Sequence, residues 1–470
     1  MSKSNIQSPY IYEKKNIWEV SNKEEISKIF IESDKYKTFL DAVRTEREGV
    51  EWIQNHVESQ GFVNLEKIIS VKPGDKIYYQ FENKNITLAI IGQDSIKNGV
   101  NIIGAHLDAP RLDLKVRPLI EENGVAMLKT HYYGGIKKYQ WLNIPLAIHG
   151  VVIKQDGSKV TINIGDKEED PVFVISDLLP HLSRKIQGEK KLLDGIEGEN
   201  LNLFVGTIPI DNKDYKDRVK ACVLEYLFHT YGIIEEDLIS AELEVVPALK
   251  TKDVGFDRSM IGGYAHDDRV CSYSALSALT QMESTPKKTA IVFLTDKEEI
   301  GSKGITGSDS QALPNIIAEL LYREDKQYHE IELRRVLNKS CCLSADVGAA
   351  LNPLFPSVHD KYNASYMGSG VIIKKYTGAA GKSSASDASA ELVAKIRRIF
   401  NENDVVWQAS SMGKIDEGGG GTIAMFIAQY GIPVIDCGIG VVGMHAPYEI
   451  ISKADLYHLI RGYKAFFVNS

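Results

Sequence analysis

Acidic residues and histidines follow several apolar runs of this chain, and both residue types bind metal ions. The stretch TDKEEIGSKG (residues 295–304) follows the apolar run AIVFL and contains two adjacent glutamates. The full set is His106 and Asp108 after NIIGA, Asp267 and Asp268 in AHDDR, Asp296, Glu298 and Glu299 after AIVFL, Asp346 after CCLSA, and His445 in GMHAPYE. Imidazole and carboxylate groups that converge on one rim would form a nitrogen and oxygen site for zinc or a similar divalent ion.

Each of these features also has an ordinary structural interpretation. A histidine after a strand is usually packed or solvated, Asp267-Asp268 is typical of a turn or a helix cap, and Glu298-Glu299 of solvated surface. The recurrence of the same residue types at the same kind of position favours a shared site. The residues alone leave both interpretations open.

The segments that must position these side chains alternate between strand-like and helix-like patterns. After about residue 250 a helix candidate (VCSYSALSAL) precedes the strands AIVFL, SCCLSA and IPVIDC, and a final amphipathic stretch follows Ser452 as its N-cap. Earlier, residues 36–60 have helical spacing that Gly61 can end, and residues 76–105 resemble strands. The alternation predicts an α/β fold with a mixed, largely parallel sheet and helices on both faces. Ligands of such sheets bind outside the carboxyl ends of the strands.

Residues 109–250 have a different pattern. VVIKQDGSKVTINIG is typical of a hairpin with Asp156-Gly157 at its turn, and VKACVLEYLFHTYG predicts a helix that stops at Gly232. The rest of this stretch is rich in strands and lacks the alternation seen later. We therefore expect a first catalytic part at 1–108, an inserted β-rich domain at 109–250 and a second catalytic part at 251–470.

Composition limits the classes of partner. The chain has 470 residues, 43% of them hydrophobic, with a net charge of −8, which does not favour a nucleic-acid partner. The N-terminal MSKSNIQSPYIYEKK lacks an apolar region, and no run of 18 apolar residues occurs, so export and membrane insertion are not expected. Five cysteines without framework spacing predict buried free thiols and a cytoplasmic protein.

Two glycine-rich motifs do not support nucleotide binding. GIGVVG (residues 438–443) matches a dinucleotide fingerprint, but Pro447 lies where the phosphate-binding helix should run. GAAGKSS (residues 378–384) resembles a phosphate-binding loop, but Tyr376 occupies the position of the required first glycine. The sequence also contains no GxSxG motif.

Taken in order, the acidic and histidine segments resemble those of the aspartyl aminopeptidases and the vacuolar aminopeptidase I type. These are two-metal exopeptidases with a zinc exopeptidase-like fold. The resemblance covers nearly the whole chain through GAHLDAP, HDDR, DKEEIGS, SADVGAALNP, GGGGTIA and GMHAPYE. Their order, spacing and strand context agree with the family pattern.

The resemblance implies a role for each of these residues. His106, Asp267 and Asp346 would hold one metal, and Asp267, Glu299 and His445 the other, with Asp267 bridging. Glu298 would be the general base for a metal-bridging hydroxide, and Asp108 would orient His106. Zinc is the expected metal, although the same ligands accept manganese or cobalt.

Other positions are less directly matched. Lys374 aligns with a family lysine near the first side chain of the substrate, where a cation would favour an N-terminal Asp or Glu; the alternative is a solvated lysine beside Lys375. Asn143 stands where relatives often have aspartate, and His266 is atypical and at most contacts a metal ligand. His181 is the nearest candidate for a histidine that enters a neighbouring subunit's site.

The sequence thus predicts a metal-dependent aminopeptidase that acts on the N-terminal residue of peptides, with an acidic or a neutral preference. The resemblance also implies a homo-oligomer, a tetrahedral dodecamer in which residues 109–250 form dimer contacts and screen the active site. The alternatives are a two-metal deacylase or carboxypeptidase, and a non-catalytic shell-forming protein of the same fold.

Overall fold

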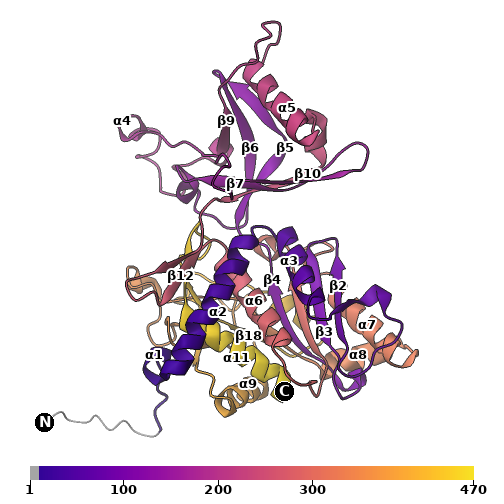
Figure 1. Cartoon of the computed structure of the whole chain (residues 1–470). Helices are drawn as coiled ribbons and strands as arrows, with labels where there is room; N and C mark the ends of the chain where they lie inside the picture. Colours follow the sequence, from indigo (N-terminus) through magenta and orange to yellow (C-terminus); the bar gives the residue numbers. More distant parts are fainter. Residues whose placement is uncertain (1–9) are drawn as a thin grey trace, which may run out of the picture.

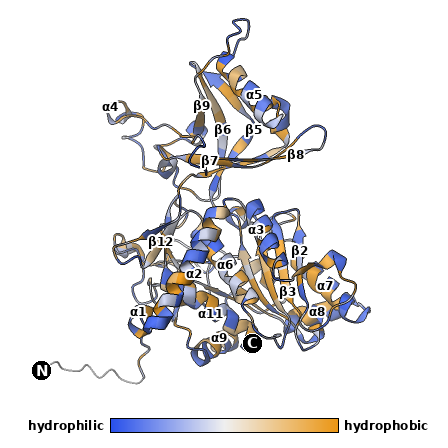
Figure 2. Ribbon diagram, in the orientation of Figure 1, coloured by the Kyte–Doolittle hydropathy of each residue, from blue (hydrophilic) through white to orange (hydrophobic). Residues whose placement is uncertain are grey.

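The structure, a computed structural model, describes residues 10–470 and shows two lobes, one above the other in Figure 1. Residues 1–9 of the N-terminal stretch considered above lie outside the described part. The lower lobe contains a large mixed sheet, and the upper lobe is built around an antiparallel sheet. Figure 2 shows hydrophobic residues along strands such as β3 and β7, and hydrophilic residues in the loop above α5.

Within residues 10–470 the large sheet has nine strands, in the order β1-β2-β3-β13-β4-β14-β18-β16-β17. Its four central strands, β13, β4, β14 and β18, run parallel, and antiparallel pairs lie toward both sides of them. The bounds are β1 Val63–Asn64, β2 Lys76–Phe81, β3 Asn85–Ile90, β13 Ala290–Thr295, β4 Asn101–His106, β14 Cys341–Ser344, β18 Val434–Gly438, β16 Val371–Lys374 and β17 Trp407–Ala409. The predicted α/β class and the strands predicted within 76–105 are confirmed.

Helices cover both faces of this sheet, as alternate strand residues contribute to two separate cores. One core includes residues of α2 (Lys23–Ala42), α3 (Glu46–Glu58), α6 (His266–Thr280), α9 (Ala390–Glu402) and α11 (Lys453–Asn469). The other includes residues of α7 (Ala312–Asp325), α8 (Glu330–Lys339) and α10 (Ala424–Ala428). Ile102 and Ile103, neighbours in β4, lie in different cores because successive strand side chains point to opposite faces. The predicted helices at 270–279 and after Ser452 are confirmed.

The upper lobe is the sheet β8-β7-β10-β5-β6-β9, antiparallel throughout its described pairs, with α5 packed on it. The bounds are β5 Arg111–Glu122, β6 Val125–Tyr133, β7 Leu146–Ile153, β8 Lys159–Ile164, α4 Pro180–Ser183, β9 Asn202–Gly206, α5 Arg218–Tyr231 and β10 Ala241–Pro247. The predicted hairpin is β7-β8, with Gly157 at φ 82°, and α5 ends at Gly232 in the left-handed region. Both predictions are confirmed.

A third sheet, which the sequence analysis did not predict, lies beside the rim of the large sheet. Its order is β11-β12-β20-β19-β15, with bounds β11 Lys252–Val254, β12 Met260–Gly263, β20 Glu449–Ser452, β19 Gly440–Val442 and β15 Gly348–Ala349. These strands are two to four residues long, and the pairs β12-β20 and β15-β19 join distant parts of the sequence, so the sheet carries no periodic signal.

The helix predicted over residues 36–60 is wrong in its extent. The chain forms α1 (Ile17–Val20), α2 and α3, with a break at residues 43–45. Thr45 caps α3 by accepting from the amide of Glu48, and the Glu48 carboxylate accepts from the amide of Thr45. This capping box favours a new helix start over continuation.

All five cysteines are free, and those other than the partly exposed Cys222 are buried. Over residues 10–470, no helix has both the length and the apolar character required to cross a membrane.

Candidate metal centre

The residues singled out in the sequence meet at the carboxyl ends of the central strands. His106 is the last residue of β4 and is the register partner of Thr295, the last residue of β13. Glu298 and Glu299 follow β13 in a short 3-10 turn, and Asp346 follows β14, which is parallel to β4. The third sheet supplies the rest, because Asp267 follows β12 and His445 lies between β19 and β20.

Three overlapping groups of these side chains offer metal-ligand atoms within 4.8 Å of one another. The groups are His106, Asp267 and Asp346; Asp267, Glu299 and His445; and His106, Glu298 and Glu299. Asp267 belongs to two of them. Its Oδ1 lies 3.5 Å from His106 Nε2, and its Oδ2 lies 3.3 Å from His445 Nε2. The first two groups are the two ligand sets implied by the family resemblance.

The other ring nitrogen of each histidine has an acceptor. His106 Nδ1 lies 3.0 Å from the carbonyl oxygen of Asp108 and 3.3 Å from its Oδ1. His445 Nδ1 lies 2.9 Å from the carbonyl oxygen of Gly135, in the upper lobe's connection. A proton held on Nδ1 leaves Nε2 as the lone-pair donor, as a metal ligand requires.

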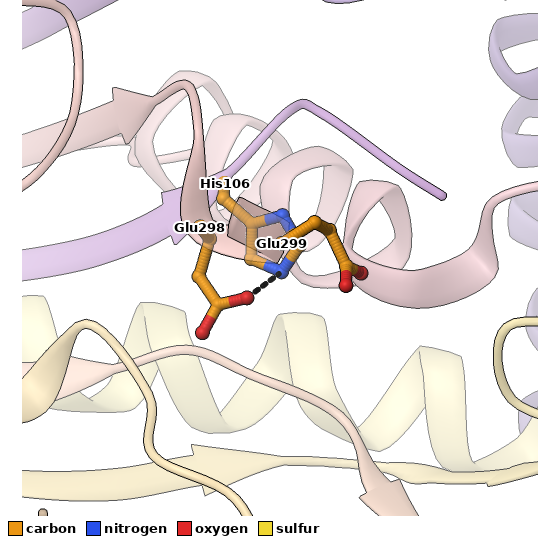
Figure 3. Close-up of side chains that lie close together, drawn as sticks. All are labelled: His106, Glu298 and Glu299. Atoms are coloured by element: carbon orange, nitrogen blue, oxygen red, sulfur yellow. Dashed lines mark ion pairs between the residues drawn. The ribbon is translucent and has the colours of Figure 1, made fainter. Parts of the chain in front are cut away.

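Asp108 also fixes the two glutamates. The amide of Glu298 donates to Asp108 Oδ1 at 3.1 Å, and the amide of Glu299 donates to Oδ2 at 3.2 Å. Figure 3 shows the carboxylates of Glu298 and Glu299 pointing away from each other, with an ion pair from Glu298 to His106. Glu298 Oε2 is 3.8 Å from His106 Nε2.

Three residues that border this site have strained backbone conformations. Ala265, Lys297 and His445 have φ angles of 64°, 66° and 65°, in the left-handed region that side chains with a Cβ rarely adopt. Ala265 precedes the His266-Asp267 segment, and Lys297 precedes Glu298. Such strain persists where surrounding contacts fix the backbone, and it is commonest at functional sites.

The charges at the rim are crowded. Burial disfavours the protonated form of His445, but its hydrogen bond with Asp267 and the nearby Glu299 raise its pKa to about 10. Burial likewise opposes charge on His106, yet hydrogen bonds to Asp108 and Asp267 hold its pKa well above its usual value. The two histidines in turn outweigh burial at Asp267 and lower the pKa of that carboxyl.

The remaining carboxyls lack enough positive charge around them. Burial raises the pKa of Glu298 to about 7. Burial, together with neighbouring carboxylates, raises the pKa of Glu299 and Asp346 well above their ordinary values. Glu299 Oε1 is buried without a hydrogen-bond partner. Unpaired buried carboxylates beside imidazole nitrogens form a donor set that fits divalent cations such as zinc.

Two residues that the sequence analysis missed hold the site together. Glu449 Oε1 accepts from the amide of His445 at 2.7 Å, and Oε2 accepts from the amide of Asp267 at 3.0 Å. Arg269 is buried and donates to the carbonyl oxygens of Leu107, Val43 and Arg44. Glu449 ends the GMHAPYE motif, and Arg269 ends HDDR, so their places in the motifs were the available signals.

Several candidates fall outside the three groups. Asp296 pairs with Lys297, and Asp268 accepts from the amide of His106 at 3.4 Å. His266 is buried and its Nδ1 is 2.8 Å from the hydroxyl of Tyr36. On the upper lobe, His181 is exposed in α4, and Asn143 Oδ1 accepts from the amide of Asp177.

Lys374 is 3% exposed, which rules out the solvated alternative considered for it. Its Nζ donates to the carbonyl oxygen of Val347 at 2.7 Å. Its charge also acts on Asp346 and Asp436, whose pKa values burial raises and Lys374 lowers. The exposed neighbour is Lys375.

Comparison with known proteins identifies the family. The sequence model described as "Aminopeptidase I zinc metalloprotease (M18)" matches residues 39–467. The chain belongs to the M18 aminopeptidase family. It is a metallo-aminopeptidase, and the chemistry of the carboxylate and histidine cluster agrees with the zinc metalloprotease description of M18.

Individual M18 proteins support this assignment over the full length. A probable M18 family aminopeptidase 1 from Borreliella afzelii is 50% identical over 455 residues, which cover 97% of this chain and 99% of the relative. The crystal structure of an M18 aminopeptidase from Thermotoga maritima matches with a TM-score of 0.94 at 45% identity, covering 98% of this chain and all of the other. The S. cerevisiae mApe1 dodecamer structure has the same fold, with a TM-score of 0.74 at 21% identity over 93% of this chain and 96% of the other.

Proposed function

We propose that the chain hydrolyses the N-terminal residue from peptides at a centre of two divalent metal ions. His106, Asp267 and Asp346 would hold one ion, and Asp267, Glu299 and His445 the other. The observation that carries this proposal is the position of Asp267, whose two oxygens face one histidine each at 3.5 and 3.3 Å. When bound, two such ions, most simply zinc, would acidify a water molecule and polarise the scissile carbonyl group.

Glu298 is the proposed general base. It lies at the same rim, is absent from the two ligand sets proposed above, and has a pKa raised to about 7 by burial. A carboxylate beside the attacking water that is not itself a ligand can accept a proton from that water and pass it to the departing amine. The role proposed for Asp108 is to orient His106 and to hold the amides of Glu298 and Glu299.

The environment of Lys374 supports a neutral rather than an acidic substrate preference. Lys374 is the candidate for contact with the first substrate side chain. Its ammonium group is already engaged by the carbonyl of Val347 and by the charges of Asp346 and Asp436. A substrate carboxylate would have to compete with these groups, so we propose that it contributes little to binding.

Hydrolysis of a peptide with a free N-terminus and of its N-acetylated form tests the proposed function. We expect cleavage of the free peptide only, in protein supplied with zinc, manganese or cobalt. Hydrolysis of the blocked peptide at a similar rate would instead support a deacylase or carboxypeptidase. Absence of hydrolysis with all three metals would support the non-catalytic, shell-forming alternative.

For the assembly, we propose a homo-oligomer, and specifically a tetrahedral dodecamer. Residues 109–250 would form the inserted domain that makes dimer contacts, and His181 would reach the site of a neighbouring subunit. Exposed apolar side chains on this part of the chain support the proposal, among them Leu182, Leu192, Leu193 and Phe228. We further propose a cytoplasmic location, which the free cysteines support.

A further inference from the structure

The segment Tyr133–Gly135 connects the upper lobe to the metal centre. It begins at the last residue of β6 in the antiparallel sheet. The hydroxyl of Tyr133 donates to Asp108 Oδ2 at 2.9 Å, and the carbonyl oxygen of Gly135 lies 2.9 Å from His445 Nδ1. Tyr133 thus contacts Asp108, the hydrogen-bond partner of His106, and Gly135 contacts His445 directly. This segment of the upper lobe therefore reaches the surroundings of both histidines.

The middle residue of the segment packs directly on a proposed ligand. Gly134 has φ 73°, and a Cβ built on it would lie 3.3 Å from Glu299 Cβ and 3.5 Å from Glu299 Oε2. Glycine is therefore favoured for two reasons: the backbone is in the left-handed region, and a Cβ would fit only if Glu299 moved by a few tenths of an ångström. A side chain at this position would push against Glu299.

A buried charge cluster fixes Tyr133 relative to both lobes. The guanidinium of Arg111 lies 3.9 Å from the centre of the Tyr133 ring, and the two residues are register partners in β5 and β6. Arg111 pairs with Glu244 of the same sheet at 3.1 Å and with Glu46 of α3, in the lower lobe, at 3.3 Å. The segment therefore cannot shift without disturbing buried ion pairs.

We propose that Tyr133–Gly135 is a positioning element that makes metal affinity depend on the placement of the upper lobe. A metal-bound histidine needs an acceptor on its other nitrogen, and loss of such a partner typically weakens metal binding about 10–100-fold. His106 receives this partner from Asp108 in its own lobe, whereas His445 receives it from Gly135. The inference rests on the ligand sets proposed above and adds that the half-site of Asp267, Glu299 and His445 is completed by the upper lobe.

Substitution of Gly134 tests this inference through metal binding rather than activity. Calorimetric titration of metal-free protein with zinc should show two sites in the wild type. In Gly134→Ala, we expect one site with wild-type affinity and one weakened at least tenfold. Gly124→Ala is the matched control, because Gly124 also lies in the upper lobe at positive φ, 77°, with no atom near a built Cβ. It should retain both affinities.

A second variant decides the case if Gly134→Ala does not fold. Tyr133→Phe keeps the ring that packs on Arg111 and removes the hydroxyl that holds Asp108. Because Asp108 also accepts from the amide of Glu299, we expect the site of Asp267, Glu299 and His445 to bind zinc about tenfold more weakly, with the metal-free melting temperature within a few degrees of wild type. Tyr132→Phe, at the exposed neighbouring ring, should bind zinc as the wild type does.

The outcomes separate this inference from the metal assignment. Wild-type protein that binds fewer than two ions would overturn the ligand sets, and with them the inference. Wild-type protein with two sites, together with unchanged affinities in folded Gly134→Ala or in Tyr133→Phe, would overturn only the inference.

Discussion

Glu298 and Glu299 are adjacent in the sequence but face different histidines. Glu298 Oε2 lies 3.8 Å from His106 Nε2, whereas Glu299 Oε2 lies 3.4 Å from His445 Nε2. Both backbone amides donate to the one carboxylate of Asp108. Asp108 therefore holds the turn from which the two side chains diverge toward different histidines.

This divergence predicts opposite effects of two equally conservative substitutions. Glu298→Gln removes the proposed proton acceptor, so kcat should fall by at least about 10²-fold while two ions per chain remain bound. Glu299→Gln removes a proposed ligand, so one ion should be lost. Metal content by elemental analysis of the purified variants, with kinetics on one peptide, checks both. Full activity in Glu298→Gln would contradict the assigned base.

Glu449 accepts from the backbone amides of two proposed metal ligands, so we predict that its substitution weakens metal binding by disturbing the backbone. Glu449→Gln would place an amide NH₂ group against one of the two buried N–H groups of Asp267 and His445. A buried donor without an acceptor costs about 1–3 kcal/mol. We expect a lower melting temperature and weaker zinc binding. Glu402→Gln, on the exposed side of α9, is the control and should change neither the melting temperature nor zinc binding. Unchanged zinc binding in Glu449→Gln would argue against a positioning role for Glu449.

The side chains at the strand ends could be predicted from the sequence because a local pattern marks them. The carboxyl ends of β4, β13 and β14 place His106, Glu298 and Asp346 on the same rim once the strands are parallel. Apolar runs identified these strands, and the rule for parallel sheets then located the rim. The motif order supplied Asp267 and His445, which belong to the short third sheet.

Contacts made over long sequence distances could not be predicted. Gly135 and His445 are 310 positions apart and meet through a backbone carbonyl, which has no residue-type signature. Tyr133 and Asp108 are closer in sequence, but their hydrogen bond depends on the return of β6 to the rim. The helix break near Thr45 was missed because apolar spacing continues across it, although the Thr45 and Glu48 capping box was visible.

The burial of Lys374 predicts that it does not select acidic substrates. We expect kcat/KM for a leucyl substrate to be at least as high as for an aspartyl substrate. Lys374→Met should lower both to a similar degree, with their ratio within about threefold of wild type, because the charge it removes faces Asp346 and Asp436. A panel of aminoacyl amides checks this. A selective loss for the aspartyl substrate would show instead that Lys374 binds the substrate carboxylate.

The buried His149 is expected to make the free energy of unfolding fall in alkaline solution. It is buried on β7, with Nδ1 2.8 Å from Glu48 Oε1 in α3 and Nε2 3.5 Å from Asp166 Oδ2. Burial disfavours its charge, but the two carboxylates raise its pKa to about 9. Unfolded histidine has a pKa of about 6.5, so the stabilisation is complete below that pH and is lost as the pH rises through about 9.

The size of this effect can be isolated by comparing variants. A shift of this size corresponds to an upper bound of about 3 kcal/mol, and part of it would be offset by relaxation around the neutral ring. The urea midpoint of the wild type should therefore fall between pH 6.5 and 9.5 by more than that of His149→Gln, which lacks the titrating group. His229→Gln is the control, because His229 is exposed and lies 3.9 Å from Glu225. Its midpoint should follow the wild type, and an equal fall in His149→Gln would contradict a charged His149 between the lobes.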